Sequence, residues 1–208
     1  MTRDEQTATL LLVFAKAPEP GRVKNRLAAV LGADTALAAH QALLERTLCL
    51  AAAFPGPAVL MLDRAETATE NRARALGLDI DYQQGVDLGE RMERAMAWGL
   101  ARAKQVLLVG SDCPAMSREY LLAAADALRQ APVVLGPSED GGFVLLGGSE
   151  AALWRQSLFR HVAMSTDHTL ADTLKALSDR CRPRLLPTLW DVDYPEDLDR
   201  ARRLGLLS

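Results

Sequence analysis

The stretch LLLVFAKAPEPGRVKNRL, residues 10–27, joins a continuous apolar run to a loop that carries two prolines, one glycine and four basic residues. An apolar run of this kind is typical of a strand in a parallel sheet that helices cover on both faces. The loop ends where a helix has to begin. Because ligands of such sheets bind at the carboxyl ends of the strands, the sequence concentrates positive charge where an anion would bind.

The rest of the chain continues this alternation, with short apolar runs followed by alanine-rich segments that have helical spacing. The runs predict strands over residues 10–14, 58–62, 106–109 and 133–135. The helical spacing predicts helices over residues 35–53, 66–76, 88–103, 117–130, 169–178 and 195–204. The segment GGFVLLGG, residues 141–148, is predicted to be a short strand that returns towards the sheet and gives it a mixed edge. The alternation indicates an α/β fold, and 208 residues suit one domain.

The composition limits the classes of partner that the chain can have. Lys and Arg total 24 against 27 Asp and Glu, so the formal net charge of −3 provides no general attraction to nucleic acid or to a membrane surface. Three widely spaced cysteines argue against a disulfide framework or a zinc knuckle. The polar N-terminus and the lack of a long apolar segment predict a soluble cytoplasmic protein.

The basic loop is a candidate phosphate site. Gly21 permits unusual backbone conformations, and Lys24 and Arg26 can neutralise phosphate oxygens beside a helix start, with Lys16 as a weaker candidate for the same anion. The loop matches neither the GxxxxGK[ST] nor the GxGxxG phosphate motif. A solvated basic loop is the alternative interpretation.

Three aspartates are candidate ligands of Mg²⁺ or Mn²⁺. Asp112 follows the predicted strand 106–109, and Asp191 and Asp193 are spaced to face one side of an extended segment. Magnesium usually takes one or two carboxylates together with phosphate oxygens. A turn or helix-cap role is the alternative for Asp112.

The segment GPSEDGGF, residues 136–143, has the glycine density of a loop whose backbone approaches a ligand. Gly141 and Gly142 are therefore candidates for phosphate binding, and Asp140 is a candidate ligand. A tight turn between two strands is the alternative for the whole segment.

Three further candidates precede predicted helices. Asp87 is either a helix cap or a contact to the base or acceptor, and Ser165 and Thr166 either hold a phosphate or cap a helix. His40 and the other two histidines lack metal-ligand spacing and an evident nucleophilic partner. This weakens the case for a hydrolase.

Taken together, six segments resemble, in order, the small bacterial nucleotide-diphospho-sugar-transferase-like family. Some members of that family are labelled arsenosugar-biosynthesis or radical-SAM/selenodomain-associated glycosyltransferases, and 2-phospho-lactate guanylyltransferases are similar more distantly. The segments are FAKAPEPGRVKNRL, QGVDLGERM, GSDCP, GPSEDGGF, MSTDHTL and DVDYPEDL. The resemblance implies that residues 1–208 form one GT-A domain, a Rossmann-like three-layer α/β/α sandwich with a mostly parallel mixed sheet.

The resemblance also implies roles for site residues. Lys24 and Arg26 would bind phosphate, Asp112 would be the metal position, and Asp191 and Asp193 would complete the metal site. Lys24, Arg26 and Asp112 are accordingly the predicted catalytic residues. The segment GSDCP lacks the second aspartate of the glycosyltransferase DxD motif, which puts ordinary glycosyl transfer in doubt.

These observations predict a metal-dependent transferase that uses a nucleotide or nucleotide-sugar and a small acceptor. Glycosyl transfer would release a nucleoside diphosphate. The alternative is nucleotidyl transfer to a phosphorylated acceptor with release of pyrophosphate, and a second alternative is a nucleotide-binding scaffold without turnover. Met164 and Phe143 depart from the family pattern and are predicted to alter the choice of acceptor.

Overall fold

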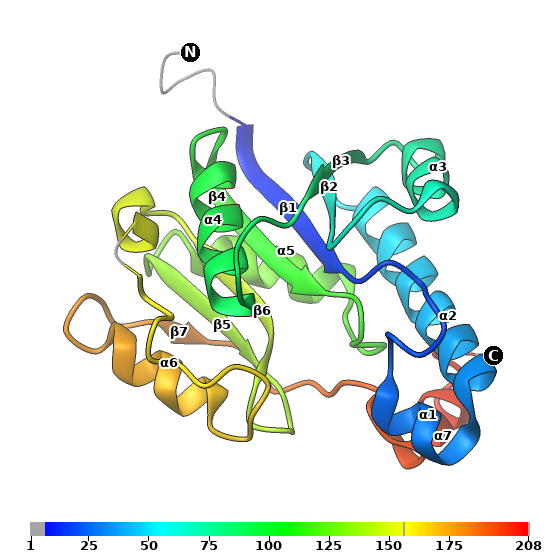
Figure 1. Ribbon diagram of the computed structural model, residues 1–208. Helices are drawn as coiled ribbons and strands as arrows, with labels where there is room; N and C mark the ends of the chain where they lie inside the picture. Colours follow the sequence, from blue (N-terminus) through cyan, green and yellow to red (C-terminus); the bar gives the residue numbers. More distant parts are fainter. Residues whose placement is uncertain (1–6, 156, 208) are drawn as a thin grey trace.

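The computed structural model describes residues 7–155 and 157–207, which contain a seven-stranded sheet with the strand order β3-β2-β1-β4-β6-β5-β7 (Figure 1). This arrangement confirms the predicted α/β fold with a mostly parallel mixed sheet. The strands are β1 (Thr7–Ala15), β2 (Ala58–Leu62), β3 (Asp79–Tyr82), β4 (Ala103–Gly110), β5 (Val133–Pro137), β6 (Phe143–Gly148) and β7 (Arg184–Leu185).

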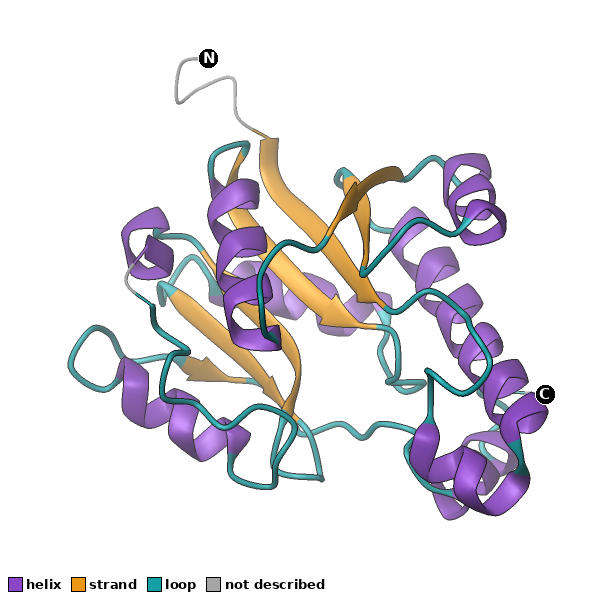
Figure 2. Ribbon diagram, viewed as in Figure 1, coloured by secondary structure: helices purple, strands orange, loops and turns teal. Residues whose placement is uncertain are grey.

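Helices cover both faces of this sheet, as the continuous apolar strands require (Figure 2). Helices α2, α3 and α5 pack on one face, and α4, the 3₁₀ helix η1 and α6 pack on the other. The helices are α1 (Asn25–Leu31), α2 (Ala33–Ala52), α3 (Thr67–Ala75), α4 (Leu88–Leu100), α5 (Arg118–Ala127), η1 (Ala151–Arg155), α6 (Thr169–Leu177) and α7 (Pro195–Arg203).

Strand β6 differs from its prediction in position. It pairs antiparallel with both β4 and β5 and therefore lies inside the sheet, whereas the sequence predicted a mixed edge. Its middle residues are apolar and buried, which suits a strand with neighbours on both sides. The edges are β3 and β7, and the sequence predicted neither because DIDY and RL are short, exposed and weakly apolar.

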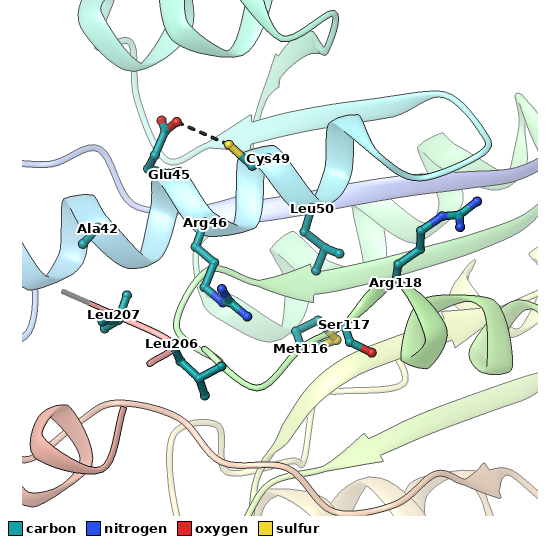
Figure 3. A pocket seen from close by; sticks show the side chains of 10 residues that line it. All are labelled: Ala42, Glu45, Arg46, Cys49, Leu50, Met116, Ser117, Arg118, Leu206 and Leu207. Atoms are coloured by element: carbon teal, nitrogen blue, oxygen red, sulfur yellow. Dashed lines mark hydrogen bonds between the residues drawn. The ribbon is translucent and has the colours of Figure 1, made fainter. Parts of the chain in front are cut away.

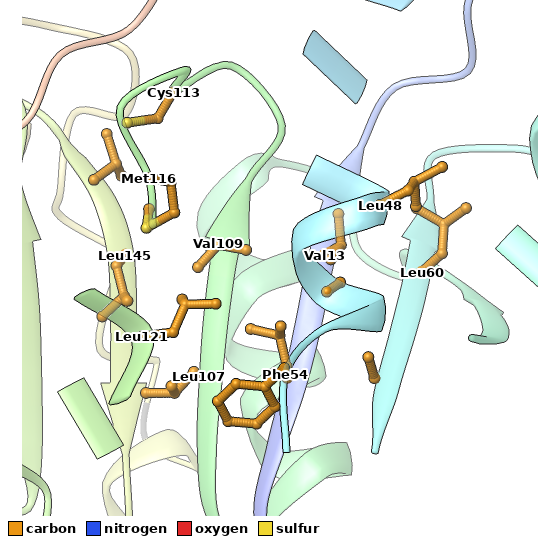
Figure 4. Close-up of a cluster of buried hydrophobic side chains, with 14 of the residues drawn as sticks. Val13, Leu48, Phe54, Leu60, Leu107, Val109, Cys113, Met116, Leu121 and Leu145 are labelled. Carbon is orange, nitrogen blue, oxygen red and sulfur yellow. The ribbon is translucent and has the colours of Figure 1, made fainter. Parts of the chain in front are cut away.

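Successive side chains of the central strands point alternately into two apolar clusters, one on each face of the sheet. Leu11 and Val13 of β1 face the α2 and α5 side, and Leu10 and Leu12 face the α4 and α6 side. Figure 4 shows part of the first of these clusters, which contains Phe54 together with side chains from α2, α5 and the strands β1, β2, β4, β5 and β6.

Two helix boundaries affect the position of the site. The predicted helix start at the end of the basic loop is confirmed at Asn25, and Gly32 then separates α1 from α2 with a φ of 84°. The helix predicted to reach residue 103 ends at Leu100, because Ala103 is already buried and paired in β4.

The three cysteines are free thiols, as predicted. Within the described residues, no helix has the length and apolar character to cross a bilayer.

Candidate active site

The site forms at the carboxyl ends of β1, β4 and β5. The basic loop leaves β1, and Asp112 lies two residues after β4. The segment between β7 and α7 crosses these strand ends, and its Val192 amide donates a hydrogen bond to the carbonyl of Asp112 (3.0 Å). This backbone contact brings Asp191 and Asp193 beside Asp112.

Lys24 is at the centre of the charged groups. Its side chain is only 3% exposed, and its Nζ lies 2.9 Å from Oδ2 of Asp112 and 3.4 Å from Oδ1 of Asp193. Arg26 extends the network, since its Nη1 lies 2.9 Å from Oδ2 of Asp193. Burial opposes the positive charge of Lys24, but the aspartates outweigh it and raise the pKa of Lys24. The lysine is therefore a buried cation, not part of a solvated loop.

The aspartates differ in their electrostatic environment. Loss of water would raise the pKa of Asp112, but Lys24 outweighs this effect and lowers it. For Asp191, burial and the negative charge of Asp112 raise the pKa to about 7. Ser138 donates a hydrogen bond to Oδ2 of Asp191 (3.2 Å) but carries no compensating charge. Lys24 therefore compensates the charge of Asp112, whereas Asp191 has too little positive charge beside it.

The three aspartates predicted as metal ligands do not form one metal-binding group. Within the described residues, no group of three or more His, Cys, Asp or Glu side chains is arranged to hold a metal ion. Lys24 pairs with both Asp112 and Asp193, and Arg26 pairs with Asp193 as well. Since magnesium usually takes one or two carboxylates together with phosphate oxygens, Asp112 and Asp191 are the residues of this site that could hold such an ion.

The loop between β5 and β6 is a hairpin turn. Oδ1 of Asp140 accepts a hydrogen bond from the amide of Gly142 (2.9 Å), so the turn interpretation of this segment is confirmed. Gly141 has a φ of 85°, and a Cβ there would lie 2.0 Å from the carbonyl oxygen of Asp167. Gly141 is therefore required for close contact with the neighbouring turn before α6.

The other predicted site residues make local contacts. Asp87 caps α4 by accepting a hydrogen bond from the amide of Glu90 (2.8 Å). Thr166 donates its hydroxyl to the carbonyl of Ala163 (2.9 Å), and Ser165 is left-handed with a φ of 61°. This turn packs against the β5–β6 hairpin, so a role of these residues in phosphate binding stays a prediction.

Sequence patterns did not identify His40 as part of the site. His40 lies inside α2 and is buried, with Nδ1 3.9 Å from Oδ1 of Asp112 and Nε2 3.0 Å from the carbonyl oxygen of Lys16. Its neighbours are far away in the sequence, so metal-ligand spacing could not reveal it. A buried polar residue in the middle of an apolar helix face was the available signal.

A groove of about 670 Å³ lies away from this site, between α2, the start of α5 and the C-terminal segment (Figure 3). Arg46 lies at its wall and donates a hydrogen bond to the carbonyl of Pro114 (2.7 Å). The charged network is instead at the carboxyl ends of the strands, where Lys24 meets the aspartates. The position of this groove therefore does not mark the candidate active site.

The strand order, the three layers and the charged groups at the strand ends define the fold class as that of the nucleotide-diphospho-sugar transferases. A crystal structure from Desulfovibrio desulfuricans G20, provisionally assigned as such a transferase, is 28% identical with a TM-score of 0.85. The match covers 95% of this chain and 87% of that chain.

The chain belongs to the family DUF2064, described as an uncharacterized protein conserved in bacteria, whose profile matches residues 47–166. That range includes Asp112 but neither the basic loop nor Asp191 and Asp193. No curated protein sequence matches the chain at a significant level.

More distant structures share the fold across nearly the whole chain. The 4-diphosphocytidyl-2C-methyl-D-erythritol synthase of Anaerococcus prevotii DSM 20548 is 14% identical with a TM-score of 0.60, covering 95% of this chain and 98% of its own. Glucosyl-3-phosphoglycerate synthase of Mycobacterium tuberculosis, in complex with Mn²⁺ and UDP, is 12% identical with a TM-score of 0.54. That match covers 98% of this chain and 78% of the synthase.

Proposed function

We propose that this protein is a metal-dependent, nucleotide-using transferase that moves a glycosyl group from a nucleoside-diphospho-sugar to a small acceptor. The observation that supports this most is the meeting of Lys24 and Arg26 with Asp112 and Asp193 at the carboxyl ends of the strands. Cations on a loop and carboxylates on the opposite side suit a polyphosphate that is held together with a divalent cation. The 28% identical structure supports a sugar nucleotide as donor.

In this proposal each charged residue has a separate task. Asp112 and Asp191 hold Mg²⁺ or Mn²⁺, which when bound would neutralise the diphosphate as it leaves the sugar. Lys24 and Arg26 turn from Asp193 to the phosphate oxygens and stabilise the leaving group. The pairing with Asp193 keeps both cations near the place where phosphate would bind.

The serine, threonine and glycine candidates have secondary tasks in the same proposal. Ser165 and Thr166, on a turn beside the β5–β6 hairpin, would offer hydroxyl or amide groups to phosphate. Gly141 and Gly142 would allow the hairpin backbone to approach it. Lys16 adds positive charge near Asp112, since it contributes to lowering the pKa of that carboxyl group.

Nucleotidyl transfer is the second candidate, and one observation favours it. The segment after β4 supplies one carboxylate, Asp112, and Pro114 occupies the place of the second aspartate of a DxD motif. In this reaction an acceptor phosphate attacks the α-phosphorus of a nucleoside triphosphate, and the bond to the pyrophosphate breaks. Lys24 and Arg26 then hold the departing pyrophosphate.

Calorimetry tests the shared part of both candidates. The purified chain is titrated with GTP, UTP, UDP-glucose and GDP-sugars in the presence of Mg²⁺ or Mn²⁺. At least one should bind, and Asp112→Asn should weaken its binding about a hundredfold, equivalent to about 2.7 kcal/mol. Asp126→Asn is the matched control, because Asp126 is an exposed aspartate on α5.

The released product then separates the candidates. A nucleoside diphosphate supports glycosyl transfer, and pyrophosphate supports nucleotidyl transfer. Nucleotide binding with neither product under any acceptor would support a scaffold without turnover. Binding that is unchanged in Asp112→Asn, or no binding of any nucleotide, would contradict the proposed site.

A further inference from the structure

Residues 15–17, the last residue of β1 and the two that follow it, are held by groups from other elements, and we call them the loop root. The carbonyl of Ala15 accepts hydrogen bonds from the amide of Asp63 (3.1 Å) and from Nε2 of Gln83 (3.0 Å). Nε2 of Gln83 also donates to a carbonyl of β2 (2.9 Å). Oδ1 of Asp63 accepts a hydrogen bond from the amide of Ala17 (2.7 Å). Two separate segments thus fix the backbone on either side of Lys16.

His40 makes a third contact to the loop root, with Lys16, the residue between Ala15 and Ala17. A carbonyl oxygen can only accept, so Nε2 of His40 carries the hydrogen and donates it to Lys16 (3.0 Å). Nδ1 lies 3.9 Å from Oδ1 of Asp112, so the same ring contacts the loop root and the candidate metal ligand.

The three side chains come from three places in the fold. His40 lies on α2, Asp63 follows β2 and Gln83 follows β3. The Asp63 side chain is 15% exposed, and His40 is 3% exposed. Beyond the loop root, residues 18–22 are largely exposed. The basic loop is therefore fixed at its start by hydrogen bonds and at its end by the ion pairs of Lys24.

We infer that His40, Asp63 and Gln83 are positioning residues that hold the loop root so that Lys24 and Arg26 reach the donor phosphates. They act through the loop backbone and need not contact the substrate. The inference rests on the proposed function for the identity of the ligand. The effect on the loop itself can be measured without any ligand.

The experiment compares paired variants of the full chain. Asp63→Ala and His40→Leu remove the hydrogen bonds to the loop root, whereas Asp63→Asn keeps an acceptor and His40→Gln keeps a donor at the same place. Glu66→Ala is the matched control. Glu66 also accepts hydrogen bonds from backbone amides, those of Ala68 and Thr69 (3.1 and 2.7 Å), but it caps α3.

Hydrogen exchange of peptides that cover residues 14–24 is the first measurement. Asp63→Ala and His40→Leu should each raise the exchange rate of this segment about tenfold, while the conservative variants and Glu66→Ala leave it within about threefold of wild type. Unchanged exchange in both disruptive variants would overturn the inference, whatever the protein binds.

Calorimetry with Mn²⁺ and the nucleotide that binds wild type best is the second measurement. Affinity should fall about tenfold in Asp63→Ala and His40→Leu, equivalent to about 1.4 kcal/mol, and should return in the conservative variants. If the disruptive variants lower only the melting temperature, as Glu66→Ala does, the side chains are merely structural and the inference is wrong. If wild type binds no nucleotide, the proposed function fails, and the exchange rates still decide whether the three residues hold the loop.

Discussion

The two ends of the basic loop are held by different forces. At its start, the loop root accepts hydrogen bonds from His40 and Gln83 and donates one to the carboxylate of Asp63. At its end, Lys24 and Arg26 form ion pairs with aspartates that lie 80 or more positions further along the chain. Both ends lie close to Asp112.

The two ends of the loop therefore differ in which of their contacts a bound ligand can replace. The carbonyl groups of Ala15 and Lys16 cannot pair with phosphate oxygens, since both only accept hydrogen bonds, so these contacts of the loop root can stay in place during a reaction. An ion pair can be exchanged, since phosphate oxygens can replace the aspartates around Lys24 and a metal ion can replace Lys24 between the aspartates. The predictions below test this contrast.

Lys24→Met should have the largest effect, because it removes the charge that joins the loop to the acids. An unpaired buried charge typically costs about 3–5 kcal/mol, and partial exposure of the carboxylates reduces the expected loss of stability to about 2–3 kcal/mol. Binding of Mn²⁺ alone should become about tenfold tighter, because the competing ammonium is gone. Urea denaturation and Mn²⁺ titration measure the two effects.

Two arginines of the loop are the controls for this variant. Arg26 and Arg22 have side chains that are 54% and 58% exposed, so substitution by alanine should change stability by less than about 1 kcal/mol in each case. Only Arg26→Ala should weaken nucleotide binding. Equal stability losses in all three variants, or weaker Mn²⁺ binding in Lys24→Met, would contradict the buried ion pair.

The protonation of Asp191 is the next test, because its pKa of about 7 lies far above the ordinary value of 3.8. Between those pH values the folded state binds more protons at this group than the unfolded state, so its contribution to stability falls as pH rises towards 7. Asp191→Asn should therefore gain stability relative to wild type from about pH 4.5 to about pH 7.5, on the order of 1–2 kcal/mol.

Urea denaturation without divalent metal, at several pH values in this range, measures that difference. Asp112, whose pKa is lowered, is already ionised across this range and adds little pH dependence there. A constant difference across the range would show that Asp191 is not held in an environment short of positive charge.

Gly21→Ala should have a smaller effect on stability than Lys24→Met. Gly21 connects the two ends of the loop with a φ of 75° and has no atom within 4 Å of an added Cβ, so the cost is only the left-handed backbone, about 1 kcal/mol. Gly205→Ala is the matched control, since Gly205 also has a positive φ (66°) and open space around it. Both variants should lose similar stability by urea denaturation, and only Gly21→Ala should weaken nucleotide binding.

The sequence was informative where a segment's environment follows from its own residues. Continuous apolar runs identified β1, β2, β4 and β5, because a strand that is buried on both faces has to be apolar throughout. The short strand DIDY did not stand out, since only pairing with β2 makes it a strand. His40 and Asp63 were missed for a related reason: their partners are backbone groups, which leave no residue pattern.

By itself, the sequence determined the alternation of strands and helices and the placement of basic and acidic residues at strand ends, because these depend on local periodicity and chain direction. Only the tertiary structure decided that β6 lies between β4 and β5 and that Lys24 is buried between Asp112 and Asp193. Whether a lysine is solvated or paired depends on which distant segments exclude water from it, and the crossing of residues 186–193 over the strand ends settles that.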